Sequence, residues 1–251
     1  MHLTHTLSSI QIRRSADALP LVVQEAPGNG RPYLHPIHSP VDGRELTQNM
    51  PDHHPWQHGI STGLVHVDES GFWTEGKHPD NLATDGAIRC QTLASPVATP
   101  EGIRWSVTAD WFDHHADHLL TERQDWFFSD HQTHSVLDLV WTLTASRDAV
   151  VKKFEYGGLF VRMPWHAPMS VSVEGNSEGD RRLAVAIKPL SGNADRWGRI
   201  AIEALDGPLA WRLDGGYGWG PSRARTGDWA LPSQTPVHER YRITIDSPEH
   251  L

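Results

Sequence analysis

The feature of this sequence that most constrains its fold is the alternation of apolar and polar residues in short runs. In the run SVLDLVWTLTAS, Leu137, Leu139, Trp141 and Leu143 occupy every second position. Successive side chains of a β-strand point to opposite faces, so a period of two predicts a half-buried strand. Runs of the same kind are SIQIRR, LPLVVQE, GAIRCQTLAS, IRWSVTADW, MSVSVEG, RRLAVAIKP, GRIAIEAL, LAWRLDG and HERYRITID.

The residues between these runs indicate how the strands are connected. Gly, Pro, Asn and Asp separate them, as in Pro27-Gly28-Asn29-Gly30 and Asp214-Gly215-Gly216. No segment longer than about 12 residues keeps an apolar stripe with the helical period. We therefore expect an all-β fold, a large antiparallel β-sandwich with few or no long helices. No shift in composition divides the chain, so residues 1–251 are expected to form one domain.

Charge and hydropathy exclude several classes of partner. The formal net charge is -9, with 31 acidic and 22 basic residues, and Lys and Arg form no cluster. This argues against nucleic acid or an anionic membrane surface as a partner. No run approaches the roughly 18 apolar residues of a membrane helix, and the first residues lack the apolar core of a signal peptide. We expect a cytoplasmic protein that binds a small molecule, with homo-oligomerisation left open.

The chain is rich in His and Trp, with 17 and 11 residues, which suit a pocket that holds a polar ring. The densest group is PDHHPWQHG at residues 51–59. Its prolines prevent a regular helix, so the segment is expected to be a loop on which several side chains can converge. Converging His residues with a carboxylate are typical of metal sites and of acid–base catalysis. Ordinary polar loop residues are the third interpretation, and the spacing does not choose among the three.

Three other segments carry candidate residues. Glu122 and Arg123 are neighbours in an expected strand, so one of the two charges must point inward and needs a partner or a ligand. Arg162 alternates with Phe160 after a glycine pair, which is consistent with a pocket floor or with an Arg stacked on a sheet surface. Tyr217 and Trp219 lie in the glycine-spaced run GGYGWGPSRAR, either as stacking surfaces for a sugar or as part of a lid.

Several segments resemble one family of uncharacterised bacterial proteins, often labelled "methane oxygenase PmoA". These segments are RPYLHP at 31–36, DHHPWQHG at 52–59, GFW at 71–73, LLTER at 119–123 and YGGLFVR at 156–162. His54 and His58 keep the pattern of the family, whereas His53 and Gln57 stand where Asp and His are common. A chain without a membrane helix cannot be the membrane subunit that the label implies. The resemblance implies a galactose-mutarotase-like supersandwich, related to carbohydrate-active enzymes of the aldose-mutarotase type, and a role in sugar or glycoside catabolism.

These observations lead to three hypotheses about function. The first is a carbohydrate-active enzyme of the lyase, epimerase or glycosidase type, in which His54 or His58, helped by Glu122 or Glu155, transfers protons. In this scheme the sugar is bound by the side chains of His35, Trp56, Trp73, Arg162, Tyr217 and Trp219. One divalent metal, Mn, Fe, Ni or Zn, bound by His54 and His58, is an open addition to it. The second hypothesis is a non-catalytic sugar-binding accessory protein, and the third is a metal-dependent oxygenase.

Overall fold

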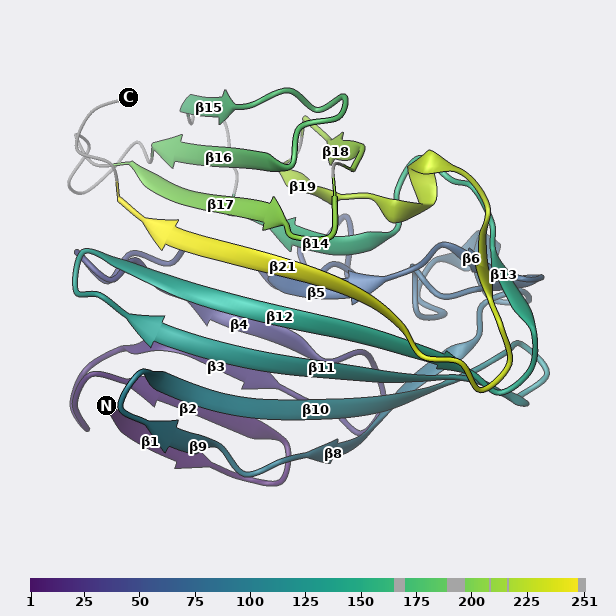
Figure 1. Cartoon of the computed structure of the whole chain (residues 1–251), viewed down its shortest axis with the longest axis horizontal. Helices are drawn as coiled ribbons and strands as arrows, with labels where there is room; N and C mark the ends of the chain where they lie inside the picture. The colour runs from purple at the N-terminus through teal and green to yellow at the C-terminus, as the bar shows by residue number, and fades with distance from the viewer. Residues whose placement is uncertain (165–169, 189–196, 208, 216, 248–251) are drawn as a thin grey trace.

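The structure is a computed structural model that describes residues 1–164, 170–188, 197–207, 209–215 and 217–247. Two large antiparallel sheets face each other, and a smaller sheet lies at one end (Figure 1). Within the described part of the chain the only helices are two short 3-10 helices, η1 (Pro79–Asn81) and η2 (Arg223–Thr226). No helix in these residues is long and apolar enough to cross a membrane. The prediction of an all-β antiparallel sandwich with few or no long helices is confirmed.

The first large sheet contains strands from the N-terminal region and from the second half of the chain. In spatial order they are β1 (His2–His5), β2 (Ser9–Arg13), β3 (Pro20–Glu25), β4 (Tyr33–Ile37), β5 (Ile60–Gly63), β14 (Gly158–Arg162), β19 (Gly218–Pro221) and β18 (Trp211–Leu213). The pairing of β5 with β14 brings together segments that are far apart in the sequence. This crossing is what assembles the pocket described below.

The second large sheet contains the longest strands. In spatial order they are β15 (Ser170–Glu174), β16 (Arg182–Lys188), β17 (Gly198–Ala204), β21 (Val237–Asp246), β12 (His134–Ala145), β11 (His118–Asp130), β10 (Gly102–Phe112) and β8 (Ala87–Leu93), with β9 (Val97–Thr99) paired to β10. The small sheet contains β20 (Trp229–Leu231), β13 (Ala149–Val151), β6 (His66–Val67) and β7 (Ser70–Gly71).

The alternation in the sequence matches the two faces of these strands. Along β12, every second residue is buried, and Leu137, Leu139, Trp141 and Leu143 all belong to the core. The same face of β11 carries Trp126, which lies opposite Leu139 in the register. Burial of large apolar side chains removes apolar surface from water and is the main stabilising contribution to such a sandwich.

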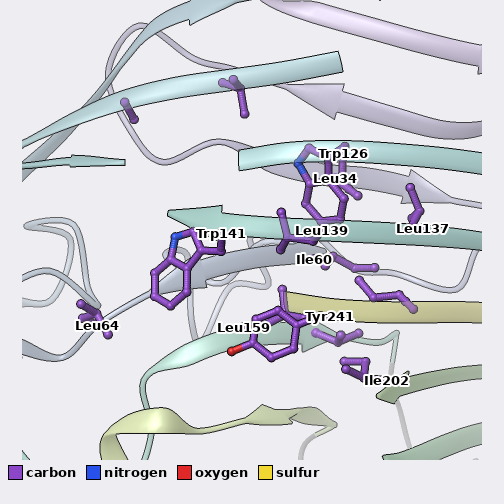
Figure 2. Packing of buried hydrophobic residues seen from close by; sticks show 14 of the residues in the cluster. Leu34, Ile60, Leu64, Trp126, Leu137, Leu139, Trp141, Leu159, Ile202 and Tyr241 are labelled. Carbon is purple, nitrogen blue, oxygen red and sulfur yellow. The ribbon is translucent and has the colours of Figure 1, made fainter. Parts of the chain in front are cut away.

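Side chains from both large sheets build one core. Figure 2 shows Trp126 and Trp141 of the second sheet close to Leu34, Ile60 and Leu159 of the first. A second, smaller cluster on the other face of β14 contains Val65, Trp73 and Phe160. Leu159 and Phe160 therefore belong to different clusters, as alternation along a strand requires. Trp73 of this second cluster lines the candidate site.

The glycine pair before β14 allows a close approach between two segments of the chain. Gly157 and Gly158 have φ angles of +140° and +145°, which disfavour other residues. A Cβ atom on Gly158 would lie 2.6 Å from the carbonyl oxygen of Pro221. The neighbour that requires glycine at this position is therefore the protein's own β19.

Candidate functional site

A polar pocket lies where the 51–58 loop, the 73–81 segment, β18 and the residues before β14 meet. Its volume is about 260 Å³. It is lined by His54, Trp56, Gln57, Trp73, Thr74, His78, Asn81, Tyr156 and Arg212. Larger hollows of about 410 Å³ and 580 Å³ lie elsewhere on the protein, but neither gathers His residues. We take the smaller pocket as the candidate site because titratable and aromatic side chains converge in it.

Arg162, the last residue of β14, forms hydrogen bonds with the 51–58 loop. It is 2% exposed, and its guanidinium donates hydrogen bonds to Gln48 Oε1 (3.2 Å), Gln57 Oε1 (3.1 Å) and His53 Nε2 (3.1 Å). The planar fork of an Arg side chain suits several acceptors at once. The sequence predicted a substrate-orienting role for Arg162, but its guanidinium is occupied by the loop. Its place in the structure is that of a positioning residue for Gln57 and His53, the neighbours of the pocket residues His54 and Trp56.

A second network, of buried ion pairs and hydrogen bonds, supports the part of the pocket wall that carries Trp73. The carboxylate of Glu75 accepts hydrogen bonds from Arg31 and, at 2.6 Å, from Lys77. Arg31 also donates to the backbone carbonyl of Trp73 at 2.8 Å, which positions that ring against the pocket. Burial acts to raise the pKa of Glu75, but Arg31, His58 and Lys77 together hold this pKa well below its usual value. Glu75 therefore stays charged.

His58 belongs to this network and not to the pocket lining. Its Nδ1 lies 2.6 Å from Asn49 Oδ1, its Nε2 lies 3.5 Å from Glu75 Oε2, and its ring stacks on Tyr33. Burial lowers the pKa of His58 in spite of the nearby Glu75. Both ring nitrogens already have neighbours, so the loop places His54, and not His58, where a ligand can bind.

His54 lies on the pocket wall between two aromatic contacts. Its ring meets those of His53 and Trp56 edge-on, with centroid distances of 4.7 Å and 5.2 Å. Burial lowers the pKa of His54, and the charges of His53, Arg162 and Arg212 act in the same direction, against Asp214. A neutral imidazole can accept a proton, so the surroundings favour the form that a general base requires. Its Nδ1 has no hydrogen-bond partner among the described residues.

Arg212 and Tyr156 form the other side of the pocket. The guanidinium carbon of Arg212 lies 3.9 Å from the ring centre of Tyr156, and 5.6 Å from that of Trp73. Its Nη2 pairs with Asp214 Oδ2 at 2.8 Å. Burial raises the pKa of Tyr156, although Arg212 acts against this shift. The phenol therefore stays protonated at neutral pH and can serve as a proton donor.

Glu122 lies in the core of the sandwich instead of the pocket. It is 0% exposed, and four side chains donate hydrogen bonds to its carboxylate: Thr62, Trp111, Gln124 and Trp141. The inward charge predicted from the sequence is present, and the partners it required belong to the core. The structure does not bring Glu122 together with His54 in the pocket.

The other predicted residues are divided between the pocket and its surroundings. Trp56 and Trp73 line the pocket as predicted. Glu155 lines the separate hollow of about 580 Å³ with Glu178 and Arg225. Trp219 is 1% exposed and its indole N–H donates to Met163 Sδ, so it is a core residue and offers no stacking face.

The last two predicted contacts also lie outside the pocket lining. His35 Nδ1 lies 3.0 Å from Thr47 Oγ1, and burial, with His38 and His58, lowers the pKa of His35 to about 4. Tyr217 packs against the main core cluster. Neither side chain is among the residues that line the pocket of His54 and Arg212.

The residues around His54 do not form a metal-binding set. In the part of the chain that the structure describes, no group of three or more His, Cys, Asp and Glu residues is arranged to hold a metal ion. His58, the second predicted ligand, is occupied by Asn49 and Glu75. The divalent metal therefore stays an untested prediction.

Sequence reasoning missed Arg212 and Tyr156. Tyr156 stands directly before the glycine pair, in the same segment as the predicted site residue Arg162. Arg212 lies between two apolar residues of the short strand β18, where a charged residue on one face is common. Only the pairing of β14, β19 and β18 brings the two side chains together.

The fold and this site define a β-sandwich protein with one compact pocket lined by aromatic, His and Arg side chains. The chain belongs to the family of unknown function DUF6807, which it matches over residues 22–250. The resemblance to proteins labelled "methane oxygenase PmoA" stays a prediction. No curated protein matches the sequence significantly.

Several solved structures resemble the chain weakly. An α-galactosidase from Lactobacillus brevis gives a TM-score of 0.43 at 11% identity, over 98% of this chain and 39% of that one. The heparan sulfate lyase HepC from Pedobacter heparinus gives 0.44 at 9% identity, over 98% and 36%. The Slr1438 protein from Synechocystis gives 0.44 at 8% identity, over 99% and 96%. The chain thus spans well under half of the first two proteins, and at these scores the likenesses support no argument about activity.

Proposed function

We propose that this protein is a carbohydrate-active enzyme whose pocket binds one sugar ring and removes a proton from a sugar carbon. The observation that carries the proposal is that His54, Tyr156 and Arg212 line one aromatic-walled pocket. The volume of about 260 Å³ lies below the range of about 300–1,000 Å³ that is usual for drug-sized ligands. A single ring with polar substituents suits this space.

The walls provide both kinds of contact that a sugar ring uses. Trp56 and Trp73 offer flat faces for the C–H side of the ring, while Gln57, Asn81 and Thr74 offer hydrogen-bonding groups for its hydroxyls. His54, kept neutral by its surroundings, takes a proton from a carbon of the bound ring. Tyr156, kept protonated, donates a proton to the oxygen or carbon on which the electron pair ends.

The lining residues favour elimination or epimerisation over hydrolysis. Glycoside hydrolysis commonly uses a pair of carboxylic acids about 5–9.5 Å apart across the bond that breaks. No Asp or Glu is among the residues that line this pocket in the described part of the chain. Removal of a proton beside a carbonyl or carboxyl group requires a base, an acid and a cation for the developing charge, and His54, Tyr156 and Arg212 supply these.

Proton exchange in D2O tests the proposal whichever product the enzyme forms. The purified chain is incubated with aldoses, keto sugars, sugar acids and their methyl glycosides, and ¹H NMR follows each C–H signal. We expect loss of one sugar C–H signal, or a new alkene or epimer signal, with the wild type. The rate should fall about 100-fold or more in His54→Ala and stay unchanged in His5→Ala, which alters an exposed His of β1.

The same experiment separates the enzyme from a sugar-binding accessory protein. Binding of a sugar without exchange or product in any sample would contradict the enzyme and favour the binder. In a binder, Trp56→Ala should weaken affinity more than His54→Ala, because the ring contact would dominate. Cytoplasmic location, self-association and a bound divalent metal are further parts of the hypothesis that await their own measurements.

A further inference from the structure

Arg212 has an unused donor group at the pocket. Its face is covered by Tyr156, and its Nη2 pairs with Asp214. Its Nη1 is buried and has no acceptor among the described residues. A buried charged donor without an acceptor is unfavourable, so an acceptor that enters the pocket gains from this atom. Protein atoms cover Nη1, while the side chain as a whole is 19% exposed and lines the pocket, so a ligand reaches Nη1 only if the side chain rotates.

The charges around the pocket favour an anion. Arg212 lines it, with Asp214 as its ion-pair partner, no carboxylate is among the lining residues in the described part of the chain, and the guanidinium of Arg162 lies directly behind His53. The chain as a whole carries a formal charge of -9, so this local excess of basic groups runs against the average of the protein. The guanidinium groups at this pocket therefore favour a negatively charged ligand over a positively charged one.

We propose that the substrate is a sugar that carries a carboxylate, such as a uronic acid or its glycoside, and that Arg212 binds this carboxylate. This inference rests on the proposed function and specifies its substrate class. A carboxylate is planar and compact, and it matches the edge of a guanidinium whose face is already stacked on a ring. A phosphate would add more volume to a pocket of about 260 Å³.

The carboxylate also makes the proton transfer chemically consistent. His54 takes the hydrogen from the ring carbon that bears the carboxyl group, and the C–H electron pair moves into the carboxyl group. Arg212 stabilises the charge that develops on the carboxyl oxygens. Return of a proton to the opposite face of that carbon gives the epimer. Expulsion of the substituent on the next carbon, with a proton from Tyr156, gives the alkene instead.

Calorimetric titration of the whole chain with matched sugars tests this inference. Glucose, glucuronate and glucose 6-phosphate differ at a single carbon, and galactose with galacturonate forms a second matched pair. We expect glucuronate or galacturonate to bind at least about tenfold more tightly than its neutral counterpart. Arg212→Gln should reduce this difference between the acid and the neutral sugar to less than about twofold. Arg104→Gln, which alters an Arg stacked on Phe127 on the outer face of β10, is the matched control.

The outcomes separate the inference from the proposed function. Equal or tighter binding of the neutral sugar, or tightest binding of the phosphate, would overturn the carboxylate and leave a sugar pocket standing. Failure of every member of the panel to bind would overturn both. If Arg212→Gln does not fold, the salt dependence of sugar binding to the wild type tests the inference instead. Binding of the acid must weaken between 0.1 M and 1 M NaCl while binding of the neutral sugar stays constant, because salt screens the charge pair.

Discussion

The guanidinium carbon of Arg212 lies 3.9 Å above the ring of Tyr156, so a cation and a proton donor form one wall of the pocket. His54 lines the same pocket. β14 follows Tyr156 and β18 carries Arg212, and β19 lies between these two strands in the sheet. The acid and the cation of the proposed reaction thus come from segments that the first sheet brings together.

Tyr156→Phe tests the acid. The ring that stacks on Arg212 remains and only the hydroxyl is lost. We expect sugar affinity within about twofold of the wild type, and a turnover number lower by about 100-fold, which is typical for loss of a general acid. Calorimetric titration and steady-state kinetics measure the two quantities. Full turnover in Tyr156→Phe would remove this residue from the reaction.

The pH dependence of turnover tests the base. The pKa of His54 is lowered from 6.5, mainly by burial, and the imidazole must be neutral to accept a proton. We therefore expect kcat/KM to rise with pH and to level off after a midpoint below 6.5. Because the charge of Arg212 contributes to the lowered pKa, Arg212→Gln should move the midpoint upward. A profile that falls with pH across this range would contradict a basic role.

Glu122→Gln distinguishes a core residue from a catalytic one. The amide keeps the shape but turns one acceptor oxygen into a donor, which then faces the indole N–H group of either Trp111 or Trp141. We expect a loss of about 2–4 kcal/mol in the free energy of unfolding, measured with urea, and unchanged sugar affinity. Glu155→Gln should change neither quantity, since Glu155 is exposed. A stable Glu122→Gln protein without turnover would instead restore the proton-transfer role that the sequence suggested.

Arg162→Met tests the positioning of the 51–58 loop. The change leaves the side-chain oxygens of Gln48 and Gln57 without their charged donor. We expect a loss of about 2 kcal/mol or more in stability and weaker sugar binding. Arg123→Met is the control, because Arg123 is 51% exposed and its pair with Asp125 should contribute at most about 1 kcal/mol. Unchanged stability in Arg162→Met would show that the loop does not depend on this contact.

Acid should destabilise the protein through His35. Its pKa falls from 6.5 to about 4 on folding, because burial disfavours the charged ring. The folded state therefore binds fewer protons than the unfolded state, so this contribution is fully present above pH 6.5 and is lost as the pH falls toward 4. In His35→Gln the melting temperature should fall less over this interval than in the wild type. Parallel pH curves for the two proteins would contradict the assignment.

The sequence alone determined the all-β architecture and the direction of many side chains. Alternation along Leu137 to Leu143 predicted the buried face of β12. The neighbours Glu122 and Arg123 predicted one inward charge, and Glu122 is indeed buried while Arg123 is exposed. These predictions succeed because the two faces of a strand are a local property, and the hydrophobic effect sorts residues between them wherever one face is covered.

Only the tertiary structure decided which side chains share a pocket. The sequence treated His54 and His58 alike, yet the loop turns one toward the pocket and the other toward Asn49 and Glu75. The sequence offered no reason to place Tyr156 beside Arg212, because the two residues are 56 positions apart. Convergence of such distant residues depends on strand order and on packing between sheets. Strand order and the packing between sheets arise from contacts between segments, so the periodicity of a single segment does not predict them.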